Sequence, residues 1–132
     1  MTETPNIKFI NLGRTSANAL PEDIISLYID DKNSRRITLN KTLTKRLKDE
    51  GFRFLRVGFS DVSTDAYFVF CKEQTSDALM INPDGKNLVI NSKFLVDTMV
   101  EKMGLSAKSQ LLKITDNIAN KPEYLTFRVN KA

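Results

Sequence analysis

The chain alternates short apolar runs with clusters of polar, turn-forming residues, which is typical of a protein built mainly from β-strands. Residues 24–30 are rich in β-branched and aromatic side chains and predict a strand. Residues 31–34 supply the polar side chains that turns favour, and residues 36–39 form a second apolar run. We therefore expect a β-hairpin here.

An amphipathic helix is predicted directly after this hairpin. Asn40 suits the N-cap position, because its side-chain oxygen can accept a hydrogen bond from an amide of the first turn. Leu43 and Leu47 are four residues apart and fall on one buried stripe. Gly51 stands where helices commonly end in the left-handed conformation, so the helix is expected to stop there.

The same order of elements recurs in the second half of the chain. Apolar runs at residues 52–59 and 66–71 predict a second hairpin, which completes a unit spanning residues 24–71. A second unit, residues 77–130, repeats the pattern of hairpin, helix and hairpin. Its elements are strands at 78–81 and 88–90, a helix capped by Asn91 or Ser92 and ended by Gly104, and strands at 110–115 and 124–129. The buried side of that helix is expected to carry Phe94, Leu95, Met99 and Met103.

Each unit is too small to bury a stable core alone, so the two are expected to share one. We predict an α+β fold: a small, mostly-β, barrel-like domain made of two tandem ββαββ units related by a pseudo-two-fold axis. Residues 1–23 are expected to form an N-terminal arm and loop. Within the arm, the apolar run 7–12 predicts either an edge strand or a loosely docked segment.

Composition excludes the commonest kinds of catalytic and metal site. The chain has no histidine and a single cysteine, Cys71, which excludes zinc sites, histidine-based triads and an intrachain disulfide. There is no glycine-rich phosphate loop and no metal-ligand spacing. Acidic residues do occupy equivalent loops of the two units, where they suit turn formation: Asp61, Asp65, Asp116 and Glu123. We therefore expect no enzymatic activity, no catalytic or metal-binding residue and no cofactor.

The sequence also bears on where the protein works. The first residues lack the basic-then-apolar order of a signal peptide, and no apolar run approaches the ~20 residues that cross a bilayer. A single cysteine fits a reducing compartment. We expect a cytoplasmic protein with no membrane association.

Positive charge is concentrated in one part of the chain. The formal net charge is +4 at pH 7, and residues 33–58 are strongly basic, whereas residues 59–86 are mainly acidic. A basic block suggests a polyanionic partner, and the alternative is a solvated helix face whose cations suit the helix dipole. The candidate nucleic-acid contacts are Arg35, Arg36, Lys41, Lys45, Arg46 and Arg53.

The first unit resembles the AbrB-like swapped-hairpin family of DNA-binding proteins. In that family Gly-Arg-hydrophobic-x-hydrophobic-Pro precedes a short helix with arginine and leucine. Residues 36–40 are similar to the first part, with Asn40 at the proline position, and Leu43, Arg46 and Leu47 resemble the helix. The resemblance implies two interlaced units in one barrel, and DNA binding of the transcription-regulator type.

Two functional hypotheses follow. One is DNA binding through phosphate contacts from the basic half. The second unit has Asn87 in place of arginine and carries Asp97 and Glu101 in its helix, so a symmetric grip on DNA would require a homodimer. The other hypothesis is a non-enzymatic viral or mobile-element accessory or structural protein whose basic face docks an acidic protein surface. Steep salt dependence of binding to a polyanion distinguishes the two.

Overall fold

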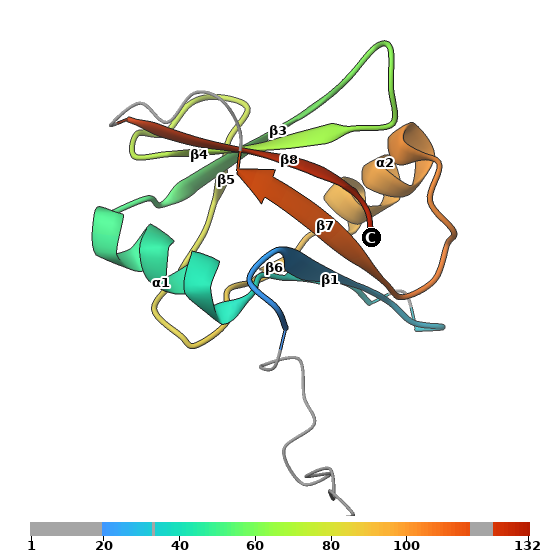
Figure 1. The fold of residues 1–132 in the computed structure, drawn as a ribbon, viewed down its shortest axis with the longest axis horizontal. Coiled ribbons are helices and arrows are strands. Elements are labelled where there is room, and N and C mark those ends of the chain that lie inside the picture. Colours follow the sequence, from blue (N-terminus) through green and yellow to red (C-terminus); the bar gives the residue numbers. More distant parts are fainter. Residues whose placement is uncertain (1–19, 33, 117–122) are drawn as a thin grey trace, which may run out of the picture.

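The computed structural model describes residues 20–32, 34–116 and 123–132, so the predicted apolar run 7–12 lies outside the described residues. Within that part of the chain, eight antiparallel strands form one curled sheet, a half-barrel, with helix α1 at the left and helix α2 at the right of the view in Figure 1. The predicted α+β, mostly-β, barrel-like fold is confirmed.

Both units contain the expected order of two strands, a helix and two strands. The first comprises β1 (Ile24–Ile29), β2 (Arg35–Thr38), α1 (Lys41–Glu50), β3 (Phe54–Phe59) and β4 (Ala66–Cys71). The second comprises β5 (Leu79–Met80), β6 (Val89–Asn91), α2 (Lys93–Met103), β7 (Gln110–Asp116) and β8 (Tyr124–Lys131).

The strand order shows how the two units interlace. The sheet runs β5-β3-β4-β8-β7-β1-β2-β6. Exchanging each strand with its counterpart in the other unit reverses the six strands from β5 to β1, which is the signature of a pseudo-two-fold axis. The first unit's β1 pairs with β7 of the second, and the second unit's β5 pairs with β3 of the first.

One hydrophobic core lies inside the curled sheet and draws side chains from both units. Phe70 of β4 is fully buried, and its ring meets Phe68 and Phe127 edge-on, with centroids 6.4 and 5.8 Å away. The helices close the core with Leu43 and Leu47 of α1 and with Val96, Met99 and Met103 of α2. The prediction for Phe94 was wrong, because this side chain is 83% exposed at the start of α2.

The helix ends follow the sequence signals. The Asn40 side chain accepts from the Leu43 amide, and Ser92, one of the two caps predicted for α2, accepts from the Leu95 amide. Gly51 and Gly104 end the helices with φ of 79° and 64°, which is the left-handed conformation that favours glycine.

Replacing Gly51 should therefore cost stability although space is available. A Cβ at this position would meet no atom within 4 Å. Gly51→Ala is still expected to lower the free energy of unfolding by about 1 kcal/mol, because an L-residue is strained in the left-handed region. Gly58→Ala is the matched control: it lies in β3 without positive φ and with equal space. Chemical denaturation that finds the two variants equally stable would contradict the conformational argument.

Candidate nucleic-acid interface

Strand alternation separates the two arginines of β2. Arg36 pairs in register with Tyr28 of β1, and its guanidinium lies 4.1 Å from the centroid of that tyrosine ring on the outer face of the sheet. Arg35 points the other way, where its Nε lies 3.1 Å from Oδ1 of Asp97 on α2. Hydrogen bonds from Lys93 and from Arg35 hold the pKa of Asp97 below its ordinary value. Arg35 therefore joins β2 to α2, and it does not share a surface with Arg36.

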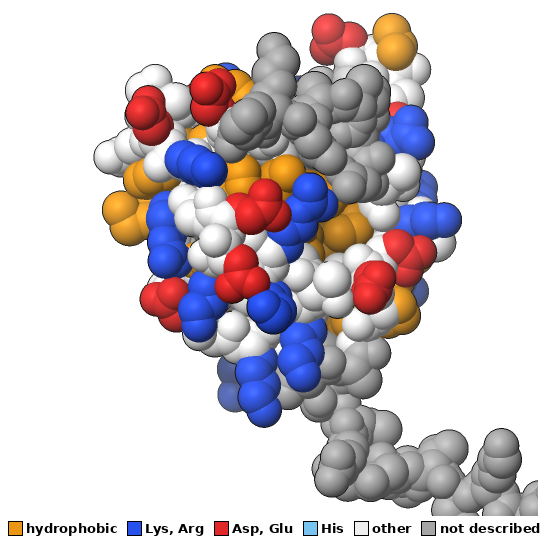
Figure 2. All heavy atoms as spheres, turned by 60° about the vertical axis from the view of Figure 1, so that its left-hand side comes forward, with side chains coloured by type: hydrophobic (Ala, Val, Ile, Leu, Met, Phe, Trp, Pro, Cys, Tyr) orange, Lys and Arg blue, Asp and Glu red, His pale blue; other side chains and the backbone are white. Residues whose placement is uncertain are grey.

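Two cations of α1 lie beside acids of the same helix. Lys45 is 2.6 Å from Asp49, and Arg46 is 3.0 Å from Glu50, each four residues further along. Figure 2 shows basic and acidic side chains interspersed over the side of the molecule that carries α1. Lys41 is exposed and has no ionic partner among the described residues. Two of the four cations on the helix, Lys45 and Arg46, are thus balanced locally.

The next two arginines meet acids from the acidic stretch that follows them in sequence. Arg53 lies 3.4 Å from Asp84, and Arg56 places Nη2 3.0 Å from Asp77 and Nε 3.1 Å from the same carboxylate. The Thr75 hydroxyl and the Arg56 guanidinium, which both donate to Asp77, lower the pKa of that carboxyl. Folding therefore brings the basic block and the acidic flank together.

A different set of cations shares the outer face with Arg36. Lys113 of β7 pairs in register with Ile24 of β1, and Arg128 of β8 pairs with Thr115 of β7. Because side chains alternate along each strand, Arg36, Lys113 and Arg128 all project from the same face as Tyr28. Lys113 and Arg128 are diagonal neighbours across two strands, a spacing of about 7 Å.

Lys113 and Arg128 line a shallow hollow of about 340 Å³ on the outer face. Its walls are Asp65, Lys113, Thr115, Arg128, Asn130 and Lys131. Asp65 already accepts from Asn130 and from the Ser63 hydroxyl. No salt bridge joins Lys113, Arg128 or Lys131 to an acid within the described part of the chain. The hollow is accordingly cationic and offers donors to an anion.

Sequence reasoning missed Lys113, Arg128 and Lys131, because they are spread over two strands, β7 and β8, outside the basic block. The sequence does contain a signal for Lys113 and Arg128. Lys113 is flanked by the buried Leu112 and Ile114, and Arg128 is flanked by apolar residues in the same way. A cation between two inward-facing apolar residues of a strand must project outward.

The remaining chemistry is sparse in the described residues. Cys71 is buried, and burial raises the pKa of its thiol, so the thiolate form is disfavoured. No cluster of three acidic, cysteine or histidine side chains suited to a metal is present in the ranges described. No helix there is long and apolar enough to cross a membrane.

The comparisons with known proteins return no relative. No family model matches the chain, and no significant match was found among curated proteins or solved structures.

Proposed function

We propose that the protein is a non-enzymatic DNA-binding module of the AbrB-like type that grips the phosphate backbone through the outer face of its sheet. The observation that carries the proposal is that Lys113, Arg128 and Lys131 line one open hollow and form no salt bridge within the described residues. Phosphate contacts supply most of the affinity of such proteins. Arginine adds a planar fork that matches two phosphate oxygens.

Topology gives a second line of support. Two interlaced units related by a pseudo-two-fold axis are what the AbrB-like resemblance implies, and the strand order has that form. Arg36 and Tyr28 lie on the same face as the hollow and extend the cationic surface across β1 and β2. Among the candidate nucleic-acid contacts on α1, Lys41 is exposed and has no ionic partner in the described residues, so it can contact a further phosphate. In this proposal Arg35, Lys45, Arg46 and Arg53 contribute chiefly through their ion pairs.

Salt-dependent binding tests the proposal. We expect the protein to bind labelled duplex DNA in fluorescence anisotropy, with affinity that falls steeply as salt rises. The Lys113→Ala/Arg128→Ala variant should reduce the slope of log K against log salt by about 2, because each lost phosphate contact removes about 0.9 from it. Single-stranded DNA of the same length serves as a second ligand and tests the preference for a duplex.

The matched control changes net charge equally at another place. Lys45→Ala/Lys93→Ala also removes two cations, but both belong to helical ion pairs. Equal weakening in both double variants would show that overall charge, rather than the hollow, governs binding. Absence of binding by the parent protein at about 50 mM salt would reject DNA binding, since such affinity is greatest at low salt. An acidic protein surface would then be the leading partner.

A further inference from the structure

The two units differ most where the half-barrel is open. In the first, β1 has six residues and pairs with β7 at four positions. Its counterpart in the second, β5, has two residues and pairs with β3 only at Phe54 and Leu55. Among the described strands, none lies beside residues 56–59 of β3 on the side away from β4. This stretch of β3 has an unpaired backbone edge where the other unit has a strand.

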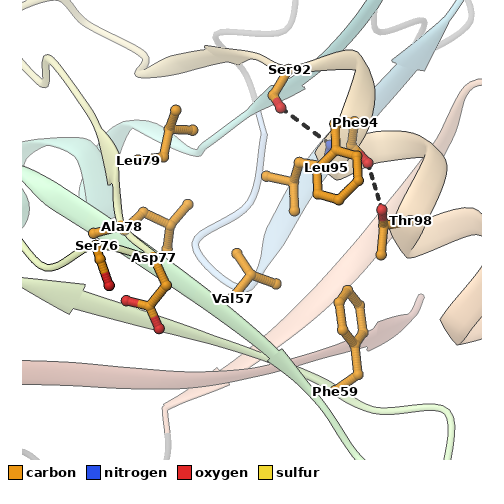
Figure 3. A pocket seen from close by; sticks show the side chains of 11 residues that line it. Val57, Phe59, Ser76, Asp77, Ala78, Leu79, Ser92, Phe94, Leu95 and Thr98 are labelled. Carbon is orange, nitrogen blue, oxygen red and sulfur yellow. Dashed lines mark hydrogen bonds between the residues drawn. The ribbon is translucent and has the colours of Figure 1, made fainter.

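An apolar hollow of about 310 Å³ lies against that edge. Val57 and Phe59 of β3 face Phe94 and Leu95 of α2 across it, and Leu79 lies along its side (Figure 3). Phe94 is 83% exposed and Leu79 38% exposed. These side chains therefore form an apolar surface with nothing described above it.

The hollow and the edge together specify the kind of occupant. An unpaired strand edge presents donors and acceptors that an extended backbone satisfies by adding a strand. Apolar walls require apolar side chains at alternate positions of that strand, because successive side chains point to opposite faces. The fitting occupant is a short, extended, apolar segment.

We propose that residues 7–12 of the same chain occupy this hollow and pair with the edge of β3. The segment contains Ile7, Phe9, Ile10 and Leu12 within an otherwise largely polar stretch, and alternation places Ile7 and Phe9 on one face. Residues 13–20 can span about 26 Å when extended, close to twice the ~14 Å radius of gyration expected for a domain of this size. Tethering gives the segment an effective concentration in the millimolar range, which favours the intramolecular contact.

A single tryptophan can report on the hollow, because the chain contains none. In the full-length Phe94→Trp protein, a docked segment should give blue-shifted emission and weak quenching by acrylamide. Adding Ile7→Glu/Phe9→Glu should shift the emission to the red and raise the quenching constant at least twofold. The control Thr4→Glu/Asn6→Glu carries the same added charge next to the apolar run and should leave both signals unchanged. Solvent-like emission in all three proteins would overturn the proposal.

Hydrogen exchange gives an independent readout that does not alter Phe94. In the otherwise unchanged full-length protein, the alternate amides of residues 56–59 that point away from β4 should exchange at least ten times faster after Ile7→Glu/Phe9→Glu than before it, whereas those bonded to β4 should not change. Equal exchange would again overturn the proposal. Light scattering should find a monomer before and after the substitution. A dimer that the substitution dissociates would show that the segment reaches a second copy, contrary to the intramolecular arrangement.

Discussion

Phe70→Ala is expected to lower the free energy of unfolding by about 3–5 kcal/mol, the range for removing a fully buried aromatic ring. The ring is 0% exposed and lies between Phe68 of its own unit and Phe127 of the other. The substitution opens a cavity between the units and removes two edge-to-face contacts, each worth about 0.5–1.5 kcal/mol beyond burial. Because the core is shared, the loss should appear in one cooperative transition.

Urea denaturation followed by far-ultraviolet circular dichroism and by tyrosine fluorescence checks this expectation. Coincident curves from the two probes are expected for both proteins. Val62→Ala is the control, because Val62 is 95% exposed and should change stability by less than about 0.5 kcal/mol. Two separated transitions would mean that the units unfold independently, against the interlaced pairing of β1 with β7 and β3 with β5.

Local signals along the chain predicted much of this architecture. Apolar runs between turn residues gave the strands, and cap chemistry gave the helix ends at Asn40, Gly51 and Gly104, because these preferences act within a few residues. The shortness of β5 was not predictable from its own composition. The length of β5 depends on how many residues of β3 it pairs with, and this pairing is a property of the assembled sheet.

The surface was less predictable than the fold, because ion pairs form between residues distant in sequence. Arg35 meets Asp97, 62 residues away, and Arg56 meets Asp77, 21 residues away. A count of charge along the chain treats these groups as separate blocks, whereas folding pairs them. Phe94 shows the same limit for apolar residues. Its place in the helical period predicted burial, and the opening of the half-barrel leaves it exposed.

Asn40→Ala is expected to lower the free energy of unfolding by about 3 kcal/mol. The Asn40 side chain caps α1 and also forms hydrogen bonds to the segment that leads into β1. Asn40 is 0% exposed. Its Oδ1 accepts from the Leu43 amide at 2.8 Å, and its Nδ2 donates to the carbonyls of Glu22 at 2.7 Å and Ile24 at 3.1 Å. Alanine removes the cap, worth about 1 kcal/mol, and leaves polar groups unpaired at about 1–3 kcal/mol.

Two further variants separate the contribution of the helix cap from that of the hydrogen bonds to Glu22 and Ile24. Ser92→Ala removes a cap whose side chain, among the described residues, bonds only to the Leu95 amide, so it should cost about 1 kcal/mol. Asn40→Asp keeps a good cap acceptor but turns carboxylate oxygens toward two carbonyls, so it should destabilise at least as much as Asn40→Ala. The midpoints of urea denaturation, measured at neutral pH, rank the three variants by stability. If Asn40→Asp matched the parent protein, the cap alone would account for this residue, and the bonds to Glu22 and Ile24 would add nothing to stability.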